Sequence, residues 1–179
     1  YFMICAAVLH NIRSVHNVGS IFRTVDAAGV EKIYLCGITP TPYDRLGNLR
    51  KDFAKVALGA EKYVPWESVK STVRGVSALK KDGWKIFAIE QSKNSVSYSG
   101  LKFSAKDKKN QKLKIALVLG DEVRGLPPSI LKYADKILEI PMRGAMMRDA
   151  NHPKYSGRGK ESLNVAVAFG IVAFGLSHS

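Results

Sequence analysis

Three groups of polar residues and glycines follow apolar runs of strand length in this chain of 179 residues. They occupy residues 17–23, residues 120–126, and residues 141–144 together with 162–164. Amide, carboxylate and guanidinium groups can orient a hydroxyl group and stabilise charge that develops on it, and glycine lets a ligand approach the backbone closely. These three groups are therefore the candidate functional sites of the chain.

Strands and helices must alternate to bring these groups together. Continuous apolar runs predict strands at residues 2–9, 32–36, 84–89, 115–120 and 136–140, and a short strand at 61–64. Helical spacing predicts helices over residues 18–28, 49–58, 66–81 and 162–175, with a short helix from Pro127 and Pro128, whereas residues 94–110 are predicted to be mostly irregular. This alternation predicts one α/β domain with a mostly parallel sheet and helices on both faces. Ligands of such sheets bind outside the carboxyl ends of the strands, where all three groups lie.

Several common ligand-binding motifs are absent from the sequence. No GxxxxGK[ST] sequence occurs, no GxGxxG follows the first apolar run, and no serine lies in a GxSxG elbow. The four histidines lack the spacing of metal ligands, and two cysteines, Cys5 and Cys36, are too few for a disulfide framework. No apolar run reaches the roughly 18 residues of a membrane span, and no secretory signal is visible. We therefore expect a cytoplasmic protein that uses no metal and no membrane.

The chain is basic, with 28 lysine and arginine residues against 15 acidic ones and a formal net charge of +13. Six lysines and one acid lie within residues 102–114, and five basic residues and one acid lie within residues 143–160. Such a charge favours a polyanionic partner, namely nucleic acid, an anionic membrane or an acidic protein. A solvated lysine-rich loop that keeps the protein soluble explains the first stretch equally well.

The three groups also match the motifs of one protein family, in the family's order and over nearly the whole chain. Residues 17–23, NVGSIFR, fit the pattern N-x-G-x-x-x-R, and residues 117–126, LVLGDEVRGL, resemble LVLGNExxGL. Residues 140–144, IPMRG, and residues 162–168, SLNVAVA, resemble IPM-x-G and SLNVSVA. On these motifs the chain resembles the SpoU (TrmH-like) family of SPOUT RNA methyltransferases.

The resemblance implies a Rossmann-like parallel sheet whose C-terminal segment forms a deep trefoil knot, with S-adenosylmethionine bound in the knot. It also implies transfer of a methyl group to a ribose 2′-hydroxyl of RNA by a homodimer in which both subunits contribute to the RNA site. Family members without an added RNA-binding domain often act on tRNA, so tRNA is preferred here over rRNA. Two alternatives stay open: a non-catalytic RNA-binding protein that retains the fold, and a methyltransferase that acts on a base.

The resemblance also assigns roles to individual residues. Arg23 matches the arginine to which the family's activation of the hydroxyl is ascribed, but a guanidinium group stays protonated and is better suited to binding a phosphate or stabilising an alkoxide. Glu122, Ser162 and Asn164 can equally stabilise helix starts. The implied catalytic residues are Asn17, Arg23, Glu122, Ser162 and Asn164. The implied cofactor-binding residues are Leu119, Gly120, Glu122, Ile140, Met142, Gly144, Ser162 and Leu163, and the implied RNA-binding residues are Arg13, His16, Arg23, Arg124 and Arg143.

The chain departs from the family pattern in two ways. Asp121, Val123 and Ala166 stand where the family commonly has asparagine, glycine and serine. Residues 145–161 are an atypical insertion within the single domain of residues 1–179, between the two halves of the third motif. The Gly, Pro and Asn content of the insertion favours a polar loop, whereas its positive charge and Tyr155 favour a lid that contacts RNA.

Overall fold

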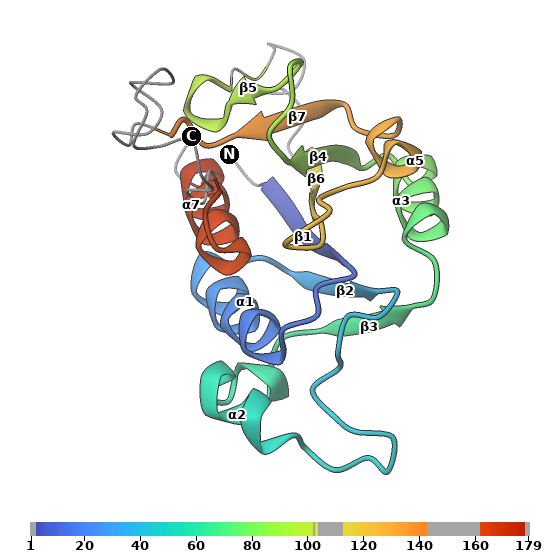
Figure 1. Ribbon diagram of the computed structural model, residues 1–179, viewed down its shortest axis with the longest axis vertical. Coiled ribbons are helices and arrows are strands. Elements are labelled where there is room, and N and C mark those ends of the chain that lie inside the picture. Colours follow the sequence, from blue (N-terminus) through green and yellow to red (C-terminus); the bar gives the residue numbers. More distant parts are fainter. Residues whose placement is uncertain (1–2, 102, 104–112, 143–161, 178–179) are drawn as a thin grey trace, which may run out of the picture.

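Parallel strands form the centre of the computed structural model, which describes residues 3–101, 103, 113–142 and 162–177 (Figure 1). Within these residues seven strands form one sheet in the order β3-β2-β1-β6-β4-β7-β5, and all neighbours are parallel. The chain runs outwards from β1 to β3 and then crosses to β4 on the other side of β1, which creates a topological switch point beside β1. The strands are β1 (Met3–His10), β2 (Lys32–Cys36), β3 (Trp66–Val69), β4 (Lys85–Ile89), β5 (Val96–Ser97), β6 (Leu113–Leu119) and β7 (Lys136–Glu139).

Helices cover both faces of the sheet (Figure 1). Alternate residues of β6 pack against the helices on opposite faces of the sheet. Ile115, Leu117 and Leu119 pack on one face, and Ala116 and Val118 pack on the other. All five are buried, as expected for a strand that is covered on both sides. The predicted α/β architecture is therefore confirmed. The first face carries α1 (Val15–Ala28), α2 (Lys51–Ala57) and α7 (Val165–Ser177), and the second carries α3 (Thr72–Lys81) and α5 (Pro128–Leu131).

The start of α1 brings the first motif into a helix. The Ser14 side chain accepts a hydrogen bond from the Asn17 backbone N–H at 3.2 Å and caps the helix. The helix therefore begins at Val15, three residues before the predicted start at residue 18. Asn17 therefore lies in the first helical turn and not in the preceding loop. Gly29, with φ of 68°, ends the helix in the left-handed conformation that glycine adopts readily.

Two other elements differ from the sequence-based prediction. Residues 66–69 form strand β3, paired with β2, and not the first turn of a helix. The Ser71 side chain accepts a hydrogen bond from the Arg74 backbone N–H, and α3 begins only after it. Val69 and Val73 are four residues apart, so their spacing mimics one helix face although a strand ends between them. Residues predicted as a strand at 61–64 instead contain a 3₁₀ helix, η1 (Ala60–Lys62).

Some predictions lie outside the described residues. They include most of the lysine-rich stretch 102–114, the insertion 145–161, and the site residues Arg143 and Gly144. The path of residues 143–161 decides whether the chain is knotted, so the knot stays an implication of the family. Among the described residues of the stretch 94–110, which was predicted to be mostly irregular, lie β5 and the short helix η2 (Tyr98–Gly100).

Candidate active site

A cavity of about 960 Å³ lies at the carboxyl ends of β4, β6 and β7 and reaches the first turns of α1 and α7. Volumes of this size are typical of sites for cofactors and other small molecules. The cavity brings together residues from all three motifs, which are separated by up to 147 positions in the chain. Its lining includes every described residue that the sequence assigned to a cofactor: Leu119, Gly120, Glu122, Ile140, Met142, Ser162 and Leu163.

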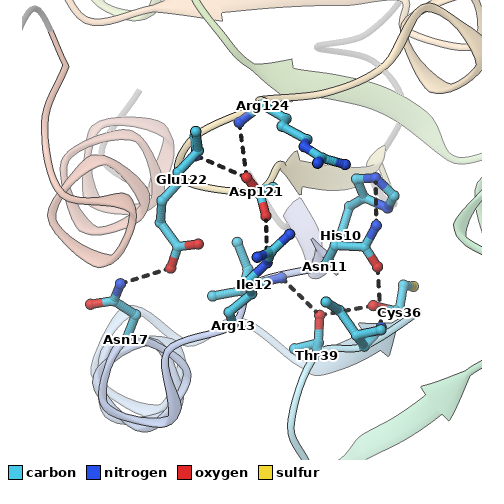
Figure 2. A network of polar contacts seen from close by, with 12 residues as sticks. His10, Asn11, Ile12, Arg13, Asn17, Cys36, Thr39, Asp121, Glu122 and Arg124 are labelled. Atoms are coloured by element: carbon cyan, nitrogen blue, oxygen red, sulfur yellow. Dashed lines mark hydrogen bonds and ion pairs between the residues drawn. The ribbon is translucent and has the colours of Figure 1, made fainter.

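A chain of hydrogen bonds, here called the amide–carboxylate chain, joins Asn164, Asn17 and Glu122. Asn164 Nδ2 donates to Asn17 Oδ1 at 3.0 Å. Asn17 Nδ2 donates to Glu122 Oε1 at 2.9 Å (Figure 2). Asn164 Oδ1 also accepts from the Ala166 backbone N–H at 2.9 Å, which caps α7. One end of the Asn164 amide therefore caps the helix, and the other end holds Asn17. The chain fixes which way both amides point.

The loop after β6 is folded too tightly for a side chain at Gly120. A Cβ there would lie 2.4 Å from the Gly125 carbonyl carbon and 2.7 Å from the Leu126 nitrogen. The Glu90 carboxylate, at the end of β4, accepts the Leu126 N–H at 2.8 Å and the Gln91 N–H at 3.0 Å. Sequence reasoning missed Glu90, although an acidic residue directly after the predicted strand 84–89 was a usable signal.

The Asp121 side chain accepts hydrogen bonds from the backbone of the same loop. Its Oδ1 accepts the N–H groups of Val123 and Arg124 at 2.9 and 2.8 Å, and its Oδ2 lies 3.2 Å from Arg13 Nε (Figure 2). The two backbone hydrogen bonds, followed by the charges of Arg13 and Arg124, lower the pKa of Asp121. The carboxylate is therefore ionised at neutral pH. The pKa of nearby His10 is lowered mainly by burial, which the charge of Asp121 opposes.

The cavity is acidic although the chain as a whole is basic. Among the described residues, its lining contains the carboxylates of Glu90, Asp121, Glu122 and Glu139 and one guanidinium group, that of Arg124. Several of these carboxylates also hold backbone or side-chain donors, as Glu139 does for the Ser95 hydroxyl. The net charge of the described lining residues is negative and suits a ligand that carries positive charge.

Three predicted site residues, Arg13, His16 and Arg23, are not part of the cavity lining. Arg23 and His16 are exposed on α1 and are not part of the lining. Arg23 follows Asn17 by six residues, which turns it about 240° around the helix axis. The salt bridges within the described residues are Arg13–Asp121, Lys32–Glu67 and Lys80–Asp135, so Arg23 takes part in none of them.

Cysteine chemistry has no place in this site. Burial raises the pKa of Cys5 to about 12 and that of Cys36 to about 11, so both thiols are protonated at neutral pH. In the described part of the chain, no group of three or more His, Cys, Asp and Glu side chains is placed to hold a metal ion. None of the helices described is long and apolar enough to cross a membrane.

A parallel sheet with helices on both faces and a cavity at its carboxyl edge defines an α/β protein that binds a small molecule there. The three motifs that meet at this cavity place the chain more narrowly. The sequence model of the SpoU rRNA Methylase family matches residues 5–147, and the chain belongs to this family.

Two curated relatives match almost the whole chain. It is 30% identical over 164 residues to the tRNA (guanosine(18)-2'-O)-methyltransferase of Aquifex aeolicus (strain VF5), a match that covers 92% of this chain and 64% of that protein. It is 29% identical over 168 residues to the 23S rRNA (guanosine-2'-O-)-methyltransferase RlmB of Ralstonia nicotianae, which covers 93% of this chain and 55% of that protein. The chain therefore spans less than two thirds of the length of either relative.

Solved structures have the same fold. The AdoMet-bound rRNA methyltransferase from Sinorhizobium meliloti matches with a TM-score of 0.77 and 24% identity over 98% of this chain and 56% of that one. The A. aeolicus TrmH/SpoU tRNA modifying enzyme matches with a TM-score of 0.70 and 28% identity over 98% of this chain and 74% of that one.

Proposed function

We propose that this protein transfers a methyl group from S-adenosylmethionine to a ribose 2′-hydroxyl of RNA, with tRNA preferred over rRNA, in the cytoplasm. The observation that carries the proposal is the convergence of three motifs on one acidic cavity, joined by the amide–carboxylate chain. The names of the two curated relatives, a tRNA and an rRNA 2′-O-methyltransferase, support the same reaction.

The residues of the cavity fit S-adenosylmethionine. Its apolar side chains, Leu119, Ile140, Met142 and Leu163, suit the flat adenine ring, and the carboxylates of the lining suit the sulfonium and ammonium charges. The absence of a Cβ at Gly120 lets the loop 120–126 close tightly, so that its backbone forms part of the cavity wall. When bound, the cofactor supplies an electrophilic methyl group. Gly144, which the sequence also assigned to the cofactor, lies outside the described residues.

The chain's own residues would position the ribose. Asn17 is fixed by hydrogen bonds at both ends of its amide. No described residue hydrogen-bonds to the second carboxylate oxygen of Glu122, which can therefore contact a ligand. Ser162 lines the cavity beside them. Holding a hydroxyl in line with the methyl group raises the rate of transfer, and a cation that stabilises the developing alkoxide raises it further. Arg23 is assigned that second role.

A methyl-transfer assay with labelled S-adenosylmethionine on total tRNA and on rRNA, followed by mass spectrometry of the nucleosides, tests the proposal. A 2′-O-methylated nucleoside formed in tRNA is the expected product. A methylated base would show instead that the enzyme acts on bases. Failure to bind S-adenosylmethionine in calorimetry would leave a non-catalytic RNA-binding protein as the explanation.

The cap and the amide–carboxylate chain can be separated at Asn164. We expect Asn164→Ala to destabilise the protein by about 1 kcal/mol because α7 loses its cap. Asn164→Asp should restore stability, since a carboxylate caps a helix as well as an amide does, but it cannot donate to Asn17. Urea denaturation and turnover measured on both variants check this. Full turnover in Asn164→Asp would contradict a role for the Asn164–Asn17 hydrogen bond.

Assembly as a homodimer is the second part of the proposal. Apolar side chains are exposed at the rim of the cavity and on the adjoining helix, with Val123 at 92%, Leu163 at 36% and Val167 at 51%. Exposed apolar groups beside a ligand site are typical of surfaces that another protein covers. Arg23 lies on α1, which packs beside α7, so the same contact would bring Arg23 close to a partner's cavity.

A charge on α7 tests the dimer. We expect Val167→Glu to convert the dimer to a monomer in size-exclusion chromatography with light scattering, because a carboxylate would be buried in the interface. Leu46→Glu is the matched control, since Leu46 is 87% exposed in the loop after β2 and away from α7. A wild-type protein that is monomeric, or a Val167→Glu variant that stays dimeric, would rule out this interface.

A further inference from the structure

An ion pair connects the segment between β1 and α1 to the second motif, across the carboxyl edge of β1 and β6. Arg13 Nε lies 3.2 Å from Asp121 Oδ2, and the side chains differ sharply in exposure, 63% for Arg13 and 6% for Asp121 (Figure 2). Asp121 lines the cavity, whereas Arg13 does not. The ion pair therefore links a residue of the cavity wall, Asp121, to an exposed residue on the adjacent surface, Arg13.

The Asp121 carboxylate is held rigidly. Its Oδ1 accepts two backbone N–H groups of its own loop, which leaves Oδ2 for Arg13. The arginine contact uses Nε, and no described residue pairs with Nη1 or Nη2, so the outer edge of the guanidinium can bind another acceptor. That edge has the spacing that binds two oxygens of a phosphate at once.

The backbone around Arg13 is fixed as well. The preceding residue, Ile12, donates its N–H to Thr39 Oγ1 at 3.1 Å, and the following residue, Ser14, caps α1. Arg13 is thus anchored on both sides of its own peptide and again at Nε. A side chain held in this way loses little conformational entropy when it binds a ligand.

The groups around Asp121 define the charge of this surface. The charge of Arg124 acts on the Asp121 carboxylate as that of Arg13 does, although among the described residues only Arg13 forms an ion pair with it. His10 adds no further donor, because its Nδ1 contacts Thr72 Oγ1 at 2.7 Å and its Nε2 receives Asn11 Nδ2 at 3.2 Å. The surface therefore keeps an excess positive charge next to an acidic cavity.

We propose that Asp121 is a positioning residue, which holds Arg13 as a fork for one phosphodiester of the RNA, with Arg124 beside it. This inference rests on the proposed function and makes it more specific. The acidic cavity attracts the cationic cofactor and repels phosphate, while the fork at its edge binds phosphate. The charges of the two sites therefore direct S-adenosylmethionine to the cavity and the RNA backbone to the adjacent surface.

The Asp121→Asn variant separates positioning from simple electrostatics. Asparagine keeps an oxygen that can accept the two backbone N–H groups, but it loses the ion pair with Arg13. Removal of a negative charge should by itself strengthen RNA binding. We expect the opposite, a threefold or larger rise in the Kd for total tRNA, measured by direct binding in the absence of S-adenosylmethionine.

Variants of the arginine complete the test. Arg13→Ala should weaken tRNA binding about tenfold and reduce the slope of log K against log salt by about 1. Arg13→Lys should recover only part of this, since an ammonium group lacks the fork. The double variant Arg13→Ala with Asp121→Asn should bind as Arg13→Ala alone does. Arg74→Ala, an exposed arginine on α3, is the control for lost charge and should bind as wild type.

Direct binding keeps this inference separate from the proposed function. If wild type binds tRNA but neither binds S-adenosylmethionine nor methylates RNA, the proposed function fails. The tRNA affinities of the variants still test whether Arg13 binds a phosphate. If Asp121→Asn binds tRNA as tightly as wild type or more tightly, Asp121 does not position Arg13. Equal losses in Arg13→Ala and Arg74→Ala would also overturn the fork, because charge alone would then explain the binding.

Discussion

Replacing Gly120 with alanine is expected to weaken cofactor binding severely. The added Cβ would lie 2.4 Å from the carbonyl carbon and 2.5 Å from the oxygen of Gly125, and both are backbone atoms that cannot turn away as a flexible side chain can. The loop 120–126 must therefore move. Because it forms one wall of the cavity, we expect the Kd for S-adenosylmethionine to rise by at least about tenfold, together with a loss of stability of about 1–3 kcal/mol.

A second glycine provides the control. A Cβ at Gly170, in the middle of α7, would meet Thr24 Cγ2 at 3.6 Å, which is an ordinary contact. Gly170→Ala should therefore leave cofactor binding unchanged and stabilise the protein by up to about 1 kcal/mol, because alanine favours helix. Calorimetric titration with S-adenosylmethionine and thermal unfolding of both variants check the pair. Normal binding by Gly120→Ala would mean that this loop does not form the cofactor site.

The sequence predicted the sheet well because its central strands are apolar on both faces. β1, β2, β4, β6 and β7 were all anticipated to within about two residues, since continuous apolar runs have few other uses in a chain of this kind. β3 was not, because Trp66 and Val69 continue the spacing of the helix that follows. Its pairing with β2 is a tertiary contact, and the local spacing of apolar residues cannot predict such a contact.

The site was predictable where a motif carried it and not where geometry alone does. Asn17, Glu122 and Asn164 were singled out by resemblance, and they meet in the amide–carboxylate chain. Glu90 and the Arg13–Asp121 ion pair were not anticipated, because each contact joins loops that are far apart in sequence. Asp121 appeared in the sequence only as a departure from a family pattern.

Arg23→Ala is expected to lower kcat by about 10²–10³-fold while the Kd for S-adenosylmethionine stays within about twofold. Arg23 lies outside the cavity lining, so its loss should not disturb the cofactor. The Arg23→Lys variant distinguishes the two ways in which a cation could act. As an electrostatic group, lysine should restore part of the rate and lose it again as it deprotonates near pH 10. As a base, lysine should instead become more active as the pH rises towards that value.

The exposed position of Arg23 leads to the sharpest test, which uses two inactive variants together. In a mixed dimer of Arg23→Ala and Gly120→Ala, the first subunit has an intact cavity and the second has an intact arginine. If Arg23 serves the cavity of the partner subunit, dimers formed by refolding an equal mixture should recover about a quarter of wild-type activity, since half are mixed and each mixed dimer has one complete site. If Arg23 serves its own cavity, the mixture should stay inactive, because neither subunit then has both parts of a site.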